Sequence, residues 1–288
     1  MTFNVAGGKE ERPSDGEAAR DRFQALVAAV RQASPDVLVL QEATEWRLVD
    51  GATVSLTRNL ACAAGFDGHH YFAPTVSLEE HMRVTRPRMV QALFDDVLDW
   101  RLGNSVLARG GFVRVGDPSR AGTPRSVPLF RAPLYEGDRN TEPRDAVLAR
   151  ANYAPIYPFV VGTHLTTLTG ERGPRAQPEA ARRAREIRAL EAERILALLD
   201  AHVLQRQEVA LLLGDLNAER DEPSIADVLE RRGGFQLLTG GEPTHRGTSL
   251  SIDHILVYPR HRLLDYRCWT VDCPASDHRA VVADVVLR

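Results

Sequence analysis

Short apolar runs and longer amphipathic stretches alternate along the first part of the chain. The run within 36–42 is short and bounded by turn-forming and polar residues, as is typical of a buried strand. Between 12 and 36, apolar residues recur every three or four positions, which predicts a helix with one buried face. The residues of that face are Phe23, Leu26, Val27 and Val30. A strand at 1–5, this helix and the strand at 36–42 together are typical of an α/β unit.

The same two patterns predict elements along the rest of the chain. Strands are predicted at 69–74, 103–110, 145–153, 157–165, 208–215, 251–259 and 280–287, and helices at 55–66, 179–203 and 223–232. The apolar face of the longest helix, 179–203, is interrupted by Glu191. Residues 110–144 are rich in Pro, Gly and Arg with weak periodicity, which predicts a long surface loop or insertion. Because no repeat or long linker divides the chain, we expect residues 1–288 to form a single domain.

Composition places the chain among soluble globular proteins, with 43% hydrophobic and 26% charged residues. No apolar stretch approaches the roughly 20 residues of a membrane helix, and the N-terminus lacks the pattern of a signal peptide. The three cysteines form no CxxC pair, which favours a reducing compartment over a zinc knuckle. We therefore expect a cytoplasmic monomer. Arginine and alanine richness, with Lys9 as the sole lysine, is typical of a GC-rich bacterial genome.

Polar residues gather where the predicted strands begin or end. The apolar run 210–213 leads directly into Gly214, Asp215, Leu216 and Asn217. In an extended chain, residues two apart point to the same side, and ligands of open α/β sheets bind at the carboxyl ends of strands. The other residues so placed are Asn4, Glu42, His164, Asp253, Asp277 and His278. Each has an ordinary structural explanation, as a turn residue or a paired charge, but together they indicate one site.

Carboxylates without cysteines are the ligands of hard cations such as Mg²⁺ or Mn²⁺. Mg²⁺ in proteins is usually held by one or two carboxylates and by phosphate oxygens of the substrate. Hydrolysis of a phosphate ester needs stabilisation of charge, an oriented water and assistance to the leaving group. The residue types at the strand ends can meet these needs. The net charge of −3 lacks the strongly basic character of a dedicated nucleic-acid binder.

The order of these motifs resembles that of the endonuclease/exonuclease/phosphatase superfamily, which has the deoxyribonuclease-I-like fold. The similar segments are TFNV, LVLQEAT, GNSVLARG, VVGTHL, GDLNAERDEPS, SIDHILV and SDHRAVVADV. The resemblance implies an α/β (α+β) fold, a four-layer sandwich with two central mixed β-sheets flanked by helices. It also implies a phosphoesterase site that depends on a divalent metal, Mg²⁺ or Mn²⁺.

The resemblance also implies roles for individual residues. The implied metal-binding residues are Glu42, Asn4 and Asp277, and the implied catalytic residues are His164, Asp215, Asn217, Asp253 and His278. Asn104 is the implied substrate-binding residue. An aspartate that binds one ring nitrogen of a histidine fixes its tautomer and stabilises the imidazolium, which gives Asp253 a physical role beside His278.

Several functions remain open from the sequence. A phosphodiesterase, nuclease-like or other, competes with a phosphomonoesterase acting on a lipid or inositol phosphate, so the partner is a phosphate-ester substrate with nucleic acid among the candidates. A dinuclear metallophosphatase of the calcineurin type is disfavoured because the nine histidines form no HxH pair. A catalytically dead binding domain on the same fold is disfavoured because all the expected positions are filled.

Overall fold

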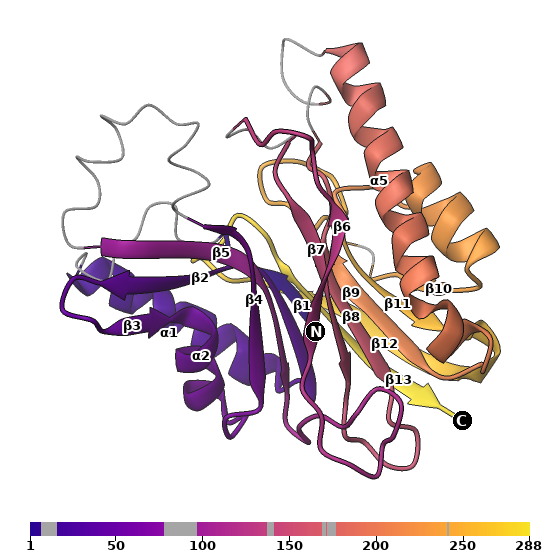
Figure 1. Ribbon diagram of the computed structural model, residues 1–288, viewed down its shortest axis with the longest axis horizontal. Coiled ribbons are helices and arrows are strands. Elements are labelled where there is room, and N and C mark those ends of the chain that lie inside the picture. The colour runs from indigo at the N-terminus through magenta and orange to yellow at the C-terminus, as the bar shows by residue number, and fades with distance from the viewer. Residues whose placement is uncertain (7–15, 78–96, 137–140, 169–170, 172–176, 241) are drawn as a thin grey trace.

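Two mixed β-sheets pack face to face, with helices on both outer faces, in the computed structural model of the chain (Figure 1). The structure describes residues 1–6, 16–77, 97–136, 141–168, 171, 177–240 and 242–288. The predicted four-layer α/β sandwich is confirmed. Residues 12–15 of the predicted first helix and 137–140 of the predicted loop lie outside the described residues.

The first sheet has seven strands over the described residues. In spatial order they are β12 (Leu263–Val271), β13 (Ala280–Leu287), β1 (Thr2–Asn4), β2 (Val37–Leu48), β5 (Val97–Ala108) and β4 (His70–Ser77), with β3 (Thr53–Ser55) paired to β2. Only the β1–β2 pair among them is parallel. The helices α1 (Gly16–Ala33) and α2 (Leu56–Ala64) cover its outer face, and α1 buries the predicted apolar positions Leu26, Val27 and Val30.

The second sheet has six strands over the same part of the chain. In spatial order they are β10 (Gln236–Leu238), β11 (Asp253–Tyr258), β9 (Ala210–Asp215), β8 (Phe159–His164), β7 (Arg144–Arg150) and β6 (Arg125–Phe130). The β8–β9 pair is parallel, and the others are antiparallel. Three helical segments pack against its outer face: α5 (Pro178–Leu199), η1 (Asp200–Leu204) and η2 (Ser224–Arg232). A short turn of helix, η3 (Arg260–Arg262), joins β11 to β12.

The interior between the sheets is built mainly from β-branched and small residues, which include Val39, Val106, Val147, Val160 and Val257. Such residues suit closely packed pleated surfaces. Separate apolar layers lie between each sheet and its own helices. The strand ends at Asn4, His164 and Asp215 lie together at one edge of the two sheets, where the loops after the strands can form a site.

Four strands were not expected from the sequence, and each has a single partner strand among the described residues: β3, β6, β10 and β12. Residues 125–130, inside the predicted loop at 110–144, form β6, which pairs with β7 alone. It lies at the edge of its sheet among the described residues, and edge strands are where a proline such as Pro128 is tolerated. The strand β12, which was not predicted, also lies at a sheet edge, and most of its residues are half-buried or exposed. Edge strands lack the strong apolar alternation that identifies buried ones.

Gly214 gives one prediction about stability. A Cβ at this position in β9 would lie 2.2 Å from the carbonyl oxygen of Thr163 on β8. We expect Gly214→Ala to lower the free energy of unfolding by about 1–3 kcal/mol, the usual effect of overpacking. Gly116→Ala is the control, since a Cβ there would meet no atom within 4 Å. Urea denaturation measures both, and equal stabilities of the two variants would contradict the expected clash.

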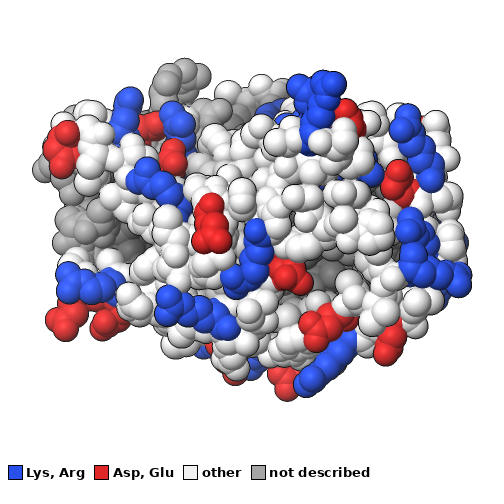
Figure 2. All heavy atoms as spheres, turned by 90° about the horizontal axis from the view of Figure 1, so that it is seen from below, with Lys and Arg blue, Asp and Glu red and all other residues white. Residues whose placement is uncertain are grey.

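Charge is evenly mixed on the face of the molecule shown in Figure 2. Arginine side chains alternate there with acidic ones, and neither sign forms a continuous patch among the coloured residues. This agrees with a chain whose formal charge is near neutral. No helix in the described part of the chain is long and apolar enough to cross a membrane.

Candidate active site

The register of the second sheet sets three of the candidate residues side by side. In the parallel pair β8–β9, His164 lies opposite Asp215. In the antiparallel pair β9–β11, Asp253 lies opposite Asp215 on its other side. Strand ends far apart in sequence therefore form one row at the carboxyl end of β9. The Nε2 atom of His164 is 3.5 Å from Oδ2 of Asp215.

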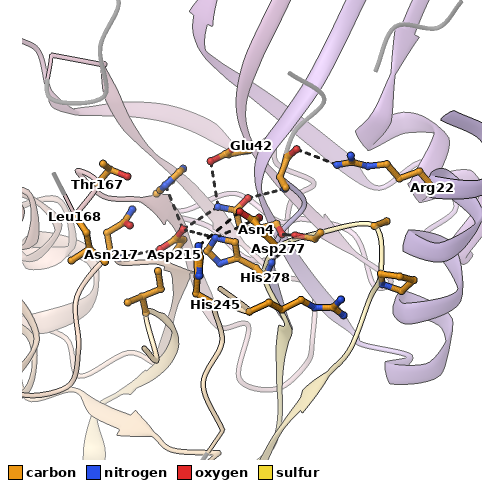
Figure 3. Close-up of a pocket in the computed structure, with 17 residues that line it drawn as sticks. Asn4, Arg22, Glu42, Thr167, Leu168, Asp215, Asn217, His245, Asp277 and His278 are labelled. Carbon is orange, nitrogen blue, oxygen red and sulfur yellow. Dashed lines mark hydrogen bonds and ion pairs between the residues drawn. The ribbon is translucent and has the colours of Figure 1, made fainter. Parts of the chain in front are cut away.

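Asn4, at the end of β1, connects this row to the first sheet. Its Nδ2 donates a hydrogen bond to Oδ2 of Asp215 at 2.9 Å and lies 3.5 Å from Oε1 of Glu42 (Figure 3). Its Oδ1 accepts a hydrogen bond from the backbone N–H of Ala6 at 2.9 Å, which fixes the direction of the amide. The ends of the two sheets thus meet at one buried amide, and the site lies where they meet.

From the sequence we expected Glu42 at the end of its strand, but in the structure it lies at a bulge within β2. The register of β2 against β5 shifts between Leu40 and Ala43, and the strand then continues to Leu48. Glu42 itself has a φ of 55°, in the left-handed region. For a residue with a side chain this conformation costs about 1–3 kcal/mol, and such strain concentrates at functional sites. A bulge can turn a side chain away from its regular direction, and Glu42 lines a cavity of about 650 Å³, hereafter the main cavity.

A tight turn, and not an extended chain, brings Asn217 near Asp215. Asn217 has a φ of 49°, and its N–H donates a hydrogen bond to Oδ1 of Asp215 at 3.0 Å. Its Nδ2 donates to the carbonyl of Leu165, the residue after His164, at 3.0 Å. The expectation that spacing along an extended strand aligns the two side chains is therefore wrong in mechanism. Both residues nevertheless line the same cavity.

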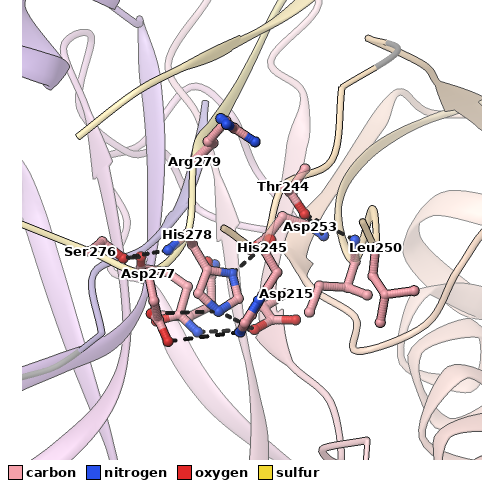
Figure 4. A network of polar contacts seen from close by, with 12 residues as sticks. Asp215, Thr244, His245, Leu250, Asp253, Ser276, Asp277, His278 and Arg279 are labelled. Carbon is pink, nitrogen blue, oxygen red and sulfur yellow. Dashed lines mark hydrogen bonds and ion pairs between the residues drawn. The ribbon is translucent and has the colours of Figure 1, made fainter. Parts of the chain in front are cut away.

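Both the ring and the backbone of His278 are fixed by hydrogen bonds (Figure 4). Its Nδ1 lies 2.8 Å from Oδ2 of Asp253, and its backbone N–H donates to Oγ of Ser276 at 3.0 Å. The hydroxyl of Ser276 in turn donates to the carbonyl of Asn4 at 2.7 Å. With Nδ1 engaged by Asp253, Nε2 is the ring nitrogen free to act on a ligand. That nitrogen is 3.8 Å from Oδ2 of Asp215.

Electrostatics make His278 a cation at neutral pH. Burial by itself lowers the pKa of His278, but the carboxylates of Asp253, Asp215 and Asp277 have the larger effect and raise the pKa to about 10. Burial, followed by repulsion from Asp253, raises the pKa of Asp215 above its ordinary value. A carboxylate that holds its proton more tightly is a better base. The two groups therefore have the properties of a base and an acid placed side by side.

Sequence reasoning missed His245, which lies in the loop between β10 and β11. Its ring packs edge-on against His278, with centroids 5.0 Å apart. Its Nε2 lies 3.8 Å from Oδ2 of Asp277. The Thr244 hydroxyl beside it accepts hydrogen bonds from the N–H groups of Ile252 and Asp253. A histidine among turn-forming residues, eight residues before a strand that begins with a candidate aspartate, was the available signal.

Asn104 is placed apart from the other candidates. Its side chain is buried, and its Nδ2 donates a hydrogen bond to the carbonyl of Asp145 at 2.9 Å. It lines a separate cavity of about 10 Å³, beside Glu42 and His164, and not the main one. In this position Asn104 ties β5 of the first sheet to β7 of the second.

The main cavity has a volume of about 650 Å³ and opens beside Asp215 and His278. Thr167 and Leu168 line it on one side of this pair, and Arg22 from α1 lines it on the other (Figure 3). This size suits a small organic molecule or part of a larger one. The cavity continues in two directions from the acid–base pair.

Glu42 and Asp277 are the candidate metal ligands from the sequence that line this cavity. Among the described residues, Asp277 groups with His245 and His278, with their ligand atoms within 4.8 Å of one another, whereas Glu42 belongs to no such group. Both side chains have only long contacts with polar neighbours among the described residues: Oε1 of Glu42 lies 3.5 Å from Nδ2 of Asn4, and Oδ2 of Asp277 lies 3.8 Å from Nε2 of His245. Asp277 is also 60% exposed. Asp215 and Asp253 add further negative charge in the interior. Uncommitted carboxylate oxygens next to an excess of negative charge fit a hard divalent cation.

Comparison with protein families decides the classification. The model of the endonuclease/exonuclease/phosphatase family matches residues 1–278. The chain belongs to this family. Nucleases and phosphatases, which the family is named after, are hydrolases of phosphate esters. A comparison with curated proteins finds no match.

Solved structures of the same family share the fold. An endonuclease/exonuclease/phosphatase from Beutenbergia cavernae is 21% identical, with a TM-score of 0.65 over 99% of this chain and 70% of that one. The catalytic domain of human nocturnin, with a bound sulfate anion, is 15% identical, with a TM-score of 0.62 over 100% and 92% of the two chains. A mannosyl-6-phosphatase from Bacteroides thetaiotaomicron is 14% identical, with a TM-score of 0.57 over 99% and 98%. At these identities the likeness establishes the fold.

Proposed function

We propose that the protein is a divalent-metal-dependent phosphodiesterase that hydrolyses its substrate by attack of water. The observation that carries the proposal is the pairing of a buried base and a buried acid at one cavity. Asp215 and the imidazolium of His278 lie 3.8 Å apart, each fixed by hydrogen bonds to other residues. Groups held in this way require little reorganisation during the reaction.

Each candidate catalytic residue of the site then has a defined task. Asp215 orients the attacking water and accepts its proton, since its pKa is raised. His278 donates from Nε2 to the phosphoryl group or to the leaving oxygen. Asp253 keeps the ring of His278 in the required tautomer. His164 and Asn217, which line the same cavity, bind the phosphoryl oxygens.

Glu42 and Asp277 would hold the metal ion, with the amide of Asn4 beside Glu42. Bound there, Mg²⁺ or Mn²⁺ supplies Lewis-acid stabilisation of the phosphoryl oxygens. The strained backbone of Glu42 is consistent with such a task, because a strained conformation persists where function requires it.

The shape of the cavity favours a diester over a monoester. A diester carries a substituent on each side of the phosphate, and the cavity extends on both sides of the acid–base pair. Arg22 on one side provides positive charge, whereas Leu168 on the other provides apolar surface. A phosphomonoesterase acting on a lipid or inositol phosphate is the alternative, since one structural neighbour is a mannosyl-6-phosphatase.

The first experiment is hydrolysis of bis-p-nitrophenyl phosphate and p-nitrophenyl phosphate, each with Mg²⁺, Mn²⁺ or EDTA. Metal-dependent cleavage of the diester supports the proposal. Activity on the monoester alone supports the alternative. Activity on either compound that EDTA leaves unchanged would contradict the metal-dependent mechanism.

Removal of one metal ligand should have a recognisable effect. We expect Glu42→Gln to lower kcat by roughly 100-fold or more at low Mg²⁺, because the loss of one ligand weakens the Lewis acid that stabilises the phosphoryl charge. Part of the loss should be restored by raising Mg²⁺ or by supplying Mn²⁺. The measurement is kcat as a function of metal concentration. Glu45→Gln, three residues along β2, is the matched control because it does not line the cavity.

A further inference from the structure

One arginine on α5 is completely buried beside the site. The side chain of Arg188 has 0% of its surface exposed. A guanidinium has five N–H donors, and burying it is tolerated only if charge and donors are matched. Two of its hydrogen bonds, from Nε and Nη2, go to Glu222 at 2.7 and 2.8 Å, and a third goes from Nη2 to Glu171 at 2.6 Å. The other two, from Nη1, go to the carbonyls of Thr166 and Thr167 at 3.2 and 3.1 Å.

These acceptors belong to loops that follow two different strands. Thr166 and Thr167 lie two and three residues after His164, the last residue of β8. Glu222 lies seven residues after Asp215, the end of β9, and its carbonyl accepts hydrogen bonds from the first turn of η2. One side chain therefore bridges the two loops that carry candidate catalytic residues of the second sheet.

Glu191, one turn along α5, completes the grip on the first loop. Its carboxylate accepts hydrogen bonds from the N–H of Thr166 at 2.9 Å and from its hydroxyl at 2.7 Å. Burial raises the pKa of Glu191 to about 7. The interruption of the apolar face of this helix is thus explained. Together, Arg188 and Glu191 engage the N–H, the carbonyl and the hydroxyl of Thr166.

The contact is transmitted to the site through one residue. Leu165, between His164 and Thr166, accepts the side-chain hydrogen bond of Asn217 at 3.0 Å. Its N–H donates to the carbonyl of Asp215 at 3.0 Å. A shift of the Thr166 segment therefore moves groups that hold Asn217 and Asp215 in place.

We propose that Arg188 is a positioning residue that sets the loops after β8 and β9 in the relative geometry needed for catalysis. It does not touch the cavity itself. The inference rests on the proposed phosphoesterase function for its kinetic readout. The chemical reason is that a planar fork of donors reaches acceptors on both loops at once, which a lysine ammonium does not.

The test compares Arg188→Lys and Arg188→Gln with Arg182→Gln. Arg182 is the matched control, because it lies on the same helix and pairs with Glu179 and Glu186 but is 59% exposed. Misplacement of reacting groups by about 1 Å can lower rates about 100-fold. We expect kcat of both Arg188 variants to fall between about 10- and 100-fold with KM changed less than about threefold, since transition-state interactions are lost and ground-state binding is retained. The control should stay within about twofold of wild type.

Hydrogen exchange gives a readout that does not depend on activity. In folded Arg188 variants, amides of 165–168 and 216–222 should exchange faster, while those of α1, across the sandwich, should not. Glu222→Gln, which keeps the pairing of Arg188 with Glu171, provides a milder variant if replacement of Arg188 prevents folding. It should show a smaller change in the same direction.

The outcomes separate the two proposals. A wild-type protein without activity on any phosphate ester would refute the proposed function, and the exchange data would still decide the role of Arg188. Unchanged exchange in these two loops, or a kcat of Arg188→Lys equal to that of wild type, would overturn the positioning role. If kcat of Arg188→Lys equals that of wild type, a positive charge at position 188 is sufficient for activity, and the fork of donors is not needed.

Discussion

Replacing His278 by glutamine is expected to lower kcat by roughly 10²–10⁴-fold, the usual contribution of a positioned acid or base. Glutamine can still accept or donate a hydrogen bond at the site, but it cannot exist as a cation at neutral pH. The loss should appear in kcat more than in KM, because the imidazolium acts on charge that develops during the reaction. Steady-state kinetics on the diester substrate measure it.

A matched control shows whether the loss of activity depends on the position of the replaced histidine. His261→Gln changes a histidine in η3, which does not line the cavity, and it should leave kcat within about twofold of wild type because it removes no interaction with the transition state. An His278→Gln variant that retains more than a tenth of wild-type kcat would contradict the assigned role.

The pH dependence of the same variant gives an independent check. Burial by itself lowers the pKa of His278. The carboxylate of Asp253, with smaller contributions from other carboxylates, outweighs this effect and raises the pKa from 6.5 to about 10 in the folded protein. A group whose folded pKa is raised stabilises the fold fully below its unfolded pKa and loses this effect as pH rises through the folded value. Wild type should thus exceed His278→Gln in stability by more at pH 6 than at pH 10. Activity of wild type should also decline as pH rises through about 10.

Urea denaturation at pH 6, 8 and 10 provides the comparison. Equal differences in unfolding free energy between wild type and His278→Gln at pH 6 and pH 10 would show that the pKa is not raised. Asp253→Asn should reduce the difference at pH 6, since it removes the main partner of the imidazolium.

Replacing Asp215 by asparagine is expected to lower kcat by about 10³-fold or more, near the upper part of the range for general base catalysis. The substitution preserves shape and leaves one oxygen for the hydrogen bond from Asn4, but its NH₂ group replaces the oxygen that accepts from the N–H of Asn217. It also removes the group that accepts the proton of water. Loss of activity should therefore come without loss of the fold.

Stability is the contrasting readout for this variant. Burial raises the pKa of Asp215, and then Asp253 raises it further. For an acid with a raised folded pKa, stability falls as pH rises from the unfolded pKa to the folded one, so the ionised carboxylate is a cost at neutral pH. We expect the removal of this cost to offset the lost hydrogen bond from Asn217, so that the unfolding free energy of Asp215→Asn at pH 7 stays within about 1 kcal/mol of that of wild type. A large loss of stability together with activity would assign Asp215 to the structure and not to the chemistry.

Much of the fold followed from pattern alone. The helix with Leu26, Val27 and Val30 on one face, the buried strand before Gly214 and the last strand all appear where periodicity predicted them. Buried elements can be identified in this way because burial imposes a regular spacing of apolar residues. The edge strands β6 and β12 carry a weaker pattern, and β6 contains a proline.

The candidate residues were also named from sequence, but their arrangement was not. No local signal shows that Glu42 lies at a bulge in the middle of β2, because a bulge depends on the register with β5. The turn at Asn217 depends on hydrogen bonds to Asp215 and Leu165. The contact of His245 with His278 joins two loops that are distant in the chain.

The sequence by itself determined which elements form and which residue types stand at the ends of the strands, because both depend on local spacing. Only the tertiary structure decided that Asn4 and Asp215 meet across two sheets, that Asn104 lies outside the main cavity, and that Arg188 joins two loops from within. These relations depend on strand order and register. Strand order and register are set by packing between distant segments, which the local pattern of a sequence does not record.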